Sequence, residues 1–341
     1  MVYFLDFRKK SYIKGRRVNA DGKPKTDVGK ALSMEKNVKL VMLNNRGGIC
    51  LLSRLFANLQ ILFAVIIRFL FVRKQIIIIQ YPYLVGCIVP ILRFLKFNKN
   101  RICTLVHDIE SLRTGMYSRN ETLLLASDII IAHTPQMKEA LMNMGFKGHI
   151  EILEFFDYIS DVDRESKQYL DKNVVFAGNL EKSTFLMQLK DISCETMFFL
   201  YGKQSDKLPL SKNVFYKGMF DADDIENVEG NWGLVWDGQS IDSCSGNYGE
   251  YLCINAPFKM SLYLAMNIPV IVWKKSAMAQ YVNEYHLGIC VNSLKEISSE
   301  IDKLSKVEIY RISQGVAKVS KEVRTGMKIR KVVRKLNTYD S

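Results

Sequence analysis

Four consecutive isoleucines in the run Gln75-Ile-Ile-Ile-Ile-Gln80, followed by Pro82, constrain the fold more than any other feature of this sequence. A strand that is apolar on both faces must be covered on both faces, which is typical of a parallel sheet flanked by helices. Similar strand signals recur through the first half of the chain and alternate with helical segments. The sequence therefore predicts a doubly wound parallel α/β sheet.

The pattern of strands and helices repeats after an irregular acidic stretch at 150–172, which is interpreted as a linker. Before it, we expect strands at 2–7, 38–43, 75–80, 102–106 and 128–132 and helices at 26–36, 50–72, 84–97, 120–126 and 134–145. After it, strands are expected at 173–177, 197–201, 214–217, 232–236 and 268–273, and most of them end next to a glycine or an aspartate. A chain of 341 residues is long enough for two such domains.

We therefore expect two Rossmann-like doubly wound domains, 1–155 and 156–318, that face a central cleft. The last segment, 319–341, has the composition of a basic helix. We expect this helix to pack back on the first domain.

The positive charge lies almost entirely in the first third of the chain. The net charge is +13, and residues 1–110 carry 20 Lys and Arg against 6 Asp and Glu, while the remainder carries 28 against 29. No acidic residue occurs between Glu35 and Asp108. This asymmetry favours a surface that faces acidic lipid, a lipid pyrophosphate or nucleic acid, and solubility alone is the other reading. Nucleic acid is disfavoured because no stacking platform or recognised binding motif is present.

Residues 51–72 form the segment of this sequence that most resembles a membrane-spanning helix. Arg54, Asn58, Gln60 and Arg68 interrupt the apolar run, and charges at mid-membrane are costly. Two readings stay open: a helix that is buried on one side and touches an anionic membrane surface with the other, or a simple core helix. The first ten residues lack an apolar signal segment, so a cytoplasmic protein, peripheral at the inner membrane face, is expected.

Cysteine and carboxylate spacings give no sign of a metal site. The seven cysteines include no C-x-x-C pair, which indicates reduced thiols. The pair Asp161-Val-Asp163 falls in the linker and is interpreted as solvated charge. Glycine-rich signatures for nucleotide hydrolysis and for dinucleotide binding are also absent. We therefore expect neither a metal nor another cofactor.

In open parallel sheets, ligands bind beyond the carboxyl ends of the strands. The first strand of the second domain ends at Gly178, where the backbone can approach a ligand closely, and Lys182 in the following turn can neutralise a phosphate. An ordinary strand-to-helix turn explains the same residues. Another strand ends at 237–238 and leads into a loop rich in Gly, Ser and Asn. Its backbone amides and hydroxyls can converge on one anion, with Ser245, Gly246, Tyr248 and Glu250 as candidates, although a flexible linker is the alternative.

The segment from Asn255 to Leu264 is the most informative. Pro257 suits the first turn of a helix, which places Lys259 in that same turn. A lysine there opposes the helix dipole, but it is favourable if a diphosphate binds at the helix N-terminus. Asn255 can cap the helix or bind the ligand, and a solvated lysine is the alternative reading.

In the first domain, His107 and Asp108 follow a strand at the rim of the expected cleft. A hydroxyl that attacks a substrate must lose its proton, and a positioned carboxylate or imidazole can accept it. Asp108 is the first candidate for this base and His107 the second. A structural turn after the strand would explain both residues equally well.

Several of these segments together resemble bacterial β-1,6-galactofuranosyltransferases of polysaccharide assembly and, more distantly, the streptococcal glucosyltransferase that extends N-acetylglucosamine on adhesins. The segments are Val106-His-Asp108, Ala132-His-Thr-Pro135, Phe176-Ala-Gly-Asn-Leu180, Gly233-Leu-Val-Trp-Asp-Gly238, Cys244-Ser-Gly-Asn-Tyr-Gly-Glu-Tyr251, Asn255-Ala-Pro-Phe-Lys259 and Ile268-Pro-Val-Ile-Val-Trp273. The likeness covers nearly the whole chain and is most specific from Gly233 to Trp273.

The resemblance implies the two-domain architecture called GT-B, a UDP-sugar donor held in the second domain, and no metal dependence. Lys259 and Lys182 would then hold the diphosphate, and Asn179, Tyr216 and Asp237 would lie near the uridine or the donor sugar. The loop from Asn19 to Lys25 is a loose match to an Asn/Gly-rich loop of the family.

The expected reaction is transfer of a hexosyl group, galactofuranose as first choice, to a glycan acceptor that is free or lipid-linked, with inversion. A transferase for UDP-glucose or UDP-galactopyranose and a catalytically silent partner subunit are the alternatives. The sequence leaves open whether the protein forms a homo-oligomer.

Overall fold

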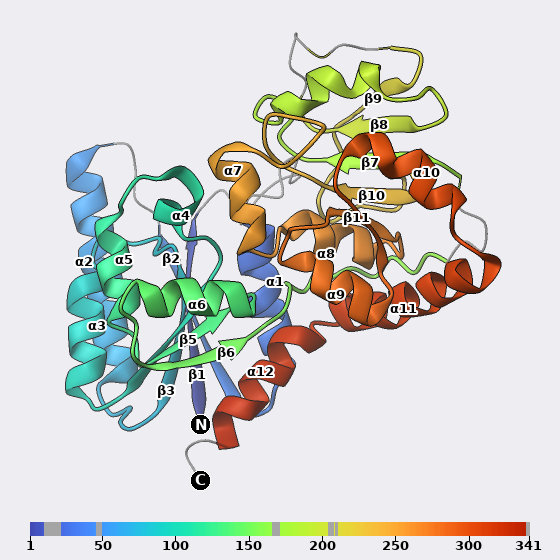
Figure 1. The fold of residues 1–341 in the computed structure, drawn as a ribbon. Coiled ribbons are helices and arrows are strands. Elements are labelled where there is room, and N and C mark those ends of the chain that lie inside the picture. Colours follow the sequence, from blue (N-terminus) through green and yellow to red (C-terminus); the bar gives the residue numbers. More distant parts are fainter. Residues whose placement is uncertain (10–21, 46–49, 166–170, 204–207, 209–210, 339–341) are drawn as a thin grey trace.

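Two parallel six-stranded sheets with helices on both faces form the molecule, as Figure 1 shows. The computed structural model describes residues 1–9, 22–45, 50–165, 171–203, 208 and 211–338. The expected loop from Asn19 to Lys25 therefore lies partly outside the described residues.

The N-terminal domain holds the first sheet, in the order β2-β1-β3-β4-β5-β6. Its strands are β1 (Val2–Lys9), β2 (Val38–Asn45), β3 (Ile76–Tyr81), β4 (Arg101–Val106), β5 (Ile129–Ala132) and β6 (His149–Ile152). Its helices are α1 (Lys23–Leu32), α2 (Leu51–Phe69), α3 (Ile88–Phe97), α4 (Glu110–Thr114), α5 (Arg119–Leu125) and α6 (Pro135–Asn143). Every residue of β3 is buried, as its unbroken apolar run predicts.

The C-terminal domain holds the second sheet, in the order β12-β11-β10-β7-β8-β9. Its strands are β7 (Asn173–Ala177), β8 (Met197–Tyr201), β9 (Val214–Gly218), β10 (Trp232–Val235), β11 (Val270–Trp273) and β12 (Gly288–Val291). Its helices are α7 (Gly246–Glu250), α8 (Phe258–Ala265), α9 (Met278–Tyr285), α10 (Ile297–Asp302) and α11 (Lys306–Arg324), with 3-10 segments η2 (Thr184–Asp191), η3 (Tyr251–Cys253) and η4 (Leu294–Glu296). The strand order reverses between β7 and β10, which is where such sheets bind ligands.

Two expectations about the elements need correction: the start of the linker and the break at residue 319. Residues 149–152 form β6 rather than linker, because Ile150 and its neighbours pair with β5. Residues 185–189, whose pattern predicts a helical segment, lie in the 3-10 helix η2, and the short helix α4 was not expected. The expected break at residue 319 falls inside α11, and the chain instead turns at Gly326, whose φ of +74° favours glycine.

After that turn, α12 (Met327–Thr338) leaves the C-terminal domain and packs on the N-terminal one. Its apolar residues Ile329, Val332, Val333 and Leu336 join the core formed by β1, β3, β4 and α1. The carboxylate of Asp157 accepts hydrogen bonds from the backbone N–H groups of Lys328 and Ile329 and so caps the helix.

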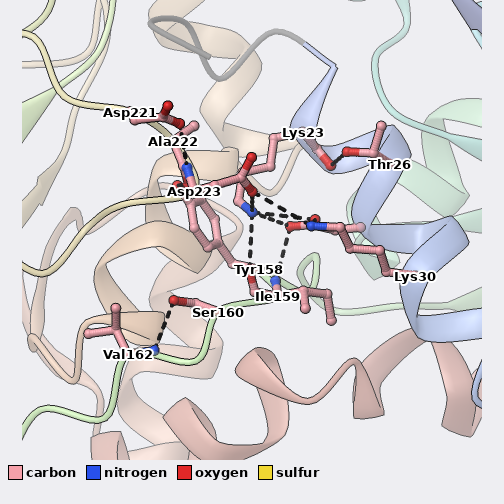
Figure 2. Close-up of polar contacts among 11 residues, drawn as sticks. Lys23, Thr26, Lys30, Tyr158, Ile159, Ser160, Val162, Asp221, Ala222 and Asp223 are labelled. Carbon is pink, nitrogen blue, oxygen red and sulfur yellow. Dashed lines mark hydrogen bonds and ion pairs between the residues drawn. The ribbon is translucent and has the colours of Figure 1, made fainter. Parts of the chain in front are cut away.

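A buried lysine ties the two domains together, as Figure 2 shows. The Lys23 ammonium, at the start of α1, lies 3.1 Å from Asp27 Oδ2 and 2.9 Å from Asp223 Oδ1 of the C-terminal domain. It also donates to the backbone oxygen of Ile159 in the linker and lies over the ring of Tyr158. Lys23 and Asp27 are fully buried, so this cluster fixes α1 against the linker and the C-terminal domain.

Candidate active site

A cavity of about 460 Å³ opens between the two domains at the carboxyl ends of their strands. Nine of the residues expected from the sequence line it: Asp108, Asn179, Lys182, Asp237, Ser245, Gly246, Tyr248, Asn255 and Lys259. Four expected residues do not line it: His107, Gly178, Tyr216 and Glu250.

Helix α8 is fixed across the switch point by Tyr263. The Tyr263 hydroxyl accepts a hydrogen bond from the backbone amide of Ala177, at the end of β7. Its ring lies against Gly233 of β10, where an added Cβ would come within 2.2 Å of the ring. Because Lys259 precedes Tyr263 by four residues, both side chains lie on the same face of α8. The packing of one tyrosine thus aims Lys259 at the gap between β7 and β10.

Lys259 points into the cavity wall and not into bulk water. Its ammonium donates to the backbone oxygen of Trp236 at 2.8 Å and to Asp237 Oδ2 at 2.9 Å, and it lies 4.7 Å from the ring centre of Phe176. Among the described residues these contacts use two of its three N–H donors, which leaves one for a ligand. Pro257 is the N-cap of α8 rather than its first helical residue, so Lys259 stays in the first turn.

The turn after β7 is held by Asn179. Its Oδ1 accepts hydrogen bonds from the backbone amides of Glu181 and Lys182. This arrangement is the local turn that was the alternative reading of the segment. It also brings Lys182, which is exposed, to the edge of the cavity.

The loop after β10 folds tightly over the strand end. Gly238 has a φ of +112°, and an added Cβ would lie 2.5 Å from the Ser245 oxygen. Gly249 is equally constrained, since its Cβ would meet the backbone of Cys244 at 2.5 Å. The loop is thus a packed structure and not a flexible linker. It carries Tyr248 to the cavity and leaves Glu250 exposed outside it.

Asn255 contributes a buried acceptor. Its Oδ1 has no hydrogen-bond partner among the described residues, although the residue lines the cavity. A buried acceptor without a partner carries a desolvation cost that a ligand donor or a water molecule would remove.

On the opposite wall, Asp108 belongs to the N-terminal domain and follows β4. Its Oδ2 accepts a hydrogen bond from Arg113 Nη1 at 3.0 Å. Burial in the cleft raises the pKa of Asp108 to about 6, while the charge of Arg113 opposes the rise. Its carboxyl group is about a third exposed, so it can still reach a ligand. A carboxylate with a pKa near neutrality can accept a proton and later release it.

The His107 side chain points away from the cavity and takes part in a buried chain of hydrogen bonds. Its Nε2 lies 2.8 Å from Gln80 Oε1, and Gln80 Nε2 donates to Asp6 Oδ1 at 3.1 Å. Burial holds the pKa of His107 well below its ordinary value. The neutral ring therefore donates from Nε2 to Gln80, and it also stacks on Phe156. This geometry favours a positioning role for His107.

Tyr216 lies on the edge strand β9, where its hydroxyl donates to the backbone oxygen of Gly202. Gly178 is exposed and flanks the cavity.

The linker carboxylate Asp163 pairs with Arg324. In the part of the chain that the structure describes, no group of three His, Cys, Asp or Glu residues is arranged to hold a metal ion.

Two features of the cavity were not predicted from the sequence: the presence of Arg113 and the contact of Tyr251 across the cleft. Arg113 lies on the unexpected helix α4, and Tyr251 of the C-terminal domain accepts a hydrogen bond from the backbone amide of Ile109 across the cleft. Nearby, His133 Nδ1 accepts from the Ala256 amide, so the start of α8 is also tied to the N-terminal domain. Contacts across two domains depend on their docking, which local sequence patterns do not reveal.

Both domains match known family models. The model of the glucosyltransferase 3-like N-terminal domain matches residues 66–155, and that of the C-terminal domain matches residues 174–336. The chain is 36% identical over 247 residues to the beta-1,6-galactofuranosyltransferase WbbI of Escherichia coli (strain K12), covering 71% of this chain and 72% of that protein. The chain belongs to the glucosyltransferase 3-like family of glycosyltransferases. This confirms the resemblance inferred from the motifs.

Another relative in the glucosyltransferase 3-like family is Glucosyltransferase 3 of Streptococcus gordonii, which is 28% identical over 70% of this chain and 71% of that protein. Solved structures share the fold at low sequence identity. HepE of Anabaena in complex with UDP and glucose has a TM-score of 0.60 and 11% identity, over 98% of this chain and 99% of that one. A glycosyltransferase from Rickettsia africae has a TM-score of 0.59 and 12% identity, over 98% and 97%. The GT-B fold is therefore confirmed.

The two family domains meet in the cavity. Asp108 falls in the range matched by the N-terminal model, and Lys259 falls in the range matched by the C-terminal model. The cavity is thus lined by residues from both domains that the family models match.

Proposed function

We propose that this protein transfers a hexosyl group, with galactofuranose as the first choice, from a UDP-sugar to a glycan acceptor in cell-surface polysaccharide assembly. One observation carries the proposal: a single cavity has Lys259 and the start of α8 on one wall and the Asp108 carboxylate on the other. The 36% identity to a β-1,6-galactofuranosyltransferase supports the choice of sugar.

The donor diphosphate would bind at the C-terminal wall. Lys259 and the free N–H groups at the start of α8 provide fixed positive charge, and Lys182 adds a point charge at the edge. As the bond between the anomeric carbon and the UDP oxygen breaks, negative charge grows on that oxygen, and these groups stabilise it. We propose that the lysines and the helix N-terminus fill the role that a metal ion has in other transferases, so that neither a metal nor another cofactor is needed.

The acceptor would approach from the N-terminal wall. Its hydroxyl oxygen forms a bond to the anomeric carbon while Asp108 takes the hydroxyl proton. The UDP oxygen leaves with the electron pair of the broken bond. Attack from the side opposite the leaving group inverts the anomeric centre, which is the outcome we propose.

A second candidate is a glucosyltransferase or galactopyranosyltransferase. The 28% identity to Glucosyltransferase 3 of Streptococcus gordonii supports a glucosyl donor. A third reading, a catalytically silent partner subunit, is disfavoured because Lys259, Asn255 and Asp108 all line one cavity. A subunit with only a structural role has no need for that arrangement.

Release of UDP from a panel of donors separates these candidates. UDP-galactofuranose, UDP-galactose and UDP-glucose are each offered with a set of glycan acceptors, and NMR of the product gives the anomeric configuration. We expect the fastest release with UDP-galactofuranose and an inverted product. Faster turnover of UDP-glucose would favour the second candidate, and no turnover with any donor alongside UDP binding would favour the silent subunit. Unchanged activity in excess chelator is the expected result for metal independence.

We also propose that the protein works in the cytoplasm. All seven cysteines are free in the structure, which suits a reducing compartment. Cell fractionation tests this location, and recovery from the cell exterior would contradict it.

A further inference from the structure

Helix α2 has two apolar faces, and only one of them is covered. The residues Ala57, Ile61, Val65 and Phe69 recur every four positions and are buried against the N-terminal domain. The opposite face carries large apolar side chains that are between 46% and 75% exposed: Leu52, Leu55, Phe56, Leu59, Phe63, Ile67 and Leu70. These seven residues are called the outer face below. An apolar patch of this length on a surface marks an interaction site.

The charged residues of α2 lie away from the outer face, while the exposed Gln60 borders it. At about 100° per residue, Arg54 and Arg68 project near the buried stripe, and Asn58 flanks it. The Asn58 side chain accepts a hydrogen bond from the backbone of Gly86, and Arg68 donates to the Ala64 oxygen within the helix. Within α2, which the structure describes completely, the outer face is therefore free of charge.

Exposed basic residues lie after α2 and on or after the neighbouring helix α3. Arg73 and Lys74 directly follow α2 and are exposed, as are Arg93 and Lys99 on and after the neighbouring helix α3. Phe71 and Phe97, at the same ends of the two helices, are 87% and 85% exposed. No acidic residue lies anywhere between Glu35 and Asp108. An apolar stripe with a basic rim is complementary to an anionic lipid surface.

The position of α2 in the fold excludes a transmembrane arrangement. By length and mean hydropathy, its 19 residues could cross a bilayer. However, α2 connects β2 and β3, two parallel strands of one sheet, and must run back along that sheet. Figure 1 places it at the outer edge of the N-terminal domain, on the side away from the C-terminal domain. The helix can thus lie in a membrane plane while the rest of the protein stays in water.

We infer that the outer face of α2, with its basic rim, is a docking surface for the anionic membrane. A second copy of the chain is the other possible occupant of the outer face, and the measurement of oligomeric state below distinguishes it from the membrane. The sequence left two readings of this segment open, and the exposure of the outer face favours the membrane surface over a core helix. The inference is independent of which sugar is transferred.

Vesicle sedimentation without donor or acceptor tests it. Full-length protein is mixed with vesicles of phosphatidylcholine alone or of phosphatidylcholine with phosphatidylglycerol. We expect binding to the anionic vesicles at least about ten-fold stronger than to the neutral ones. The variant Phe56→Ser with Phe63→Ser should weaken binding on the order of 100-fold. The variant Arg73→Glu with Lys74→Glu should remove most of the preference for anionic lipid.

The matched control is Val307→Ser with Tyr310→Ser on α11, which removes two apolar side chains of similar exposure (59% and 61%) from another helix. It should bind vesicles like the wild type. Thermal melting checks that each variant folds, and size-exclusion chromatography reports the oligomeric state. Equal or absent binding to the two kinds of vesicle would overturn the inference. So would a dimer that the Phe56 and Phe63 changes convert to a monomer, because the outer face would then belong to a second copy.

Discussion

Arg113 Nη1 lies 3.0 Å from Asp108 Oδ2, so a guanidinium from α4 faces the proposed base at the rim of the cleft. Burial raises the pKa of Asp108 to about 6, and the positive charge of Arg113 keeps the pKa from rising further. The pair thus determines the pH range in which the carboxylate can accept a proton.

Changing this pair should move the pH profile in a defined direction. A base must be unprotonated to act, so kcat/KM should rise with pH through about 6 and level off above it. The variant Arg113→Met removes the charge that favours the carboxylate, and the acid limb should shift to higher pH. Asp108→Asn should lose roughly 100-fold or more in rate and lose that limb. Wild-type rates in folded Asp108→Asn would remove Asp108 as the base.

Lys259 should contribute to the transition state more than to folding. Lys259→Ala should raise the barrier by about 2–4 kcal/mol, by analogy with the removal of a preorganised donor. Binding of UDP, measured by calorimetry, should weaken as well. The exposed Lys190 lies outside the cavity and offers the control Lys190→Ala, which should behave like the wild type. If Lys259→Ala keeps both its rate and its UDP affinity, the proposed donor site is wrong.

Adding one carbon at Gly233 or removing the hydroxyl of Tyr263 should measurably lower the free energy of unfolding. In Gly233→Ala, the new methyl group would overlap the Tyr263 ring, which should destabilise the fold by roughly 1–3 kcal/mol. Tyr263→Phe leaves the buried Ala177 amide without its acceptor, at a cost of about 1–3 kcal/mol. Urea unfolding measures both costs. A Gly233→Ala protein as stable as the wild type would mean that α8 can shift freely.

The buried lysine between the domains predicts a dependence of stability on pH. In Lys23→Met, Asp27 loses its buried cation, and stability should fall by about 3–5 kcal/mol near neutral pH. Burial already raises the pKa of Asp27, and losing Lys23 raises it further. A carboxyl whose folded pKa is raised destabilises the fold as pH rises above its unfolded value near 4.

The difference in free energy of unfolding between the wild type and Lys23→Met should therefore become smaller as the pH is lowered from 7 toward about 4. Denaturant unfolding of both proteins across this range measures it. Lys23→Met with Asp27→Leu should recover part of the loss, since it leaves no uncompensated charge. A difference that stays constant with pH would show that Asp27 is not the group responsible.

The sequence predicted well whatever depends on local pattern. The isoleucines of β3, the glycine-ended strands of the second domain and the lysine at the start of α8 follow from rules that act within a few residues. These features were enough to predict the two-domain fold and most of one cavity wall.

The sequence predicted poorly whatever depends on contacts between distant segments. Tyr251 contacts Ile109 because the domains dock, and Arg113 pairs with Asp108 from a helix that the local pattern did not predict. Lys23 is fully buried although it lies in a segment that the sequence suggested to be a loop. His107 had the right position along the chain, but its ring turns toward Gln80 because a buried acceptor is available there. Burial and docking arise only in the assembled structure, so these assignments required the coordinates.

The return of α12 to the N-terminal domain affects how the protein is made. The side chains of Ile329, Val332, Val333 and Leu336 complete a core layer whose other members include Val2 and Phe4, so the first domain to leave the ribosome is the last to be finished. A nascent chain that still lacks α12 must hold that layer open to water. Truncations that remove α12 should therefore harm the folding of the N-terminal half.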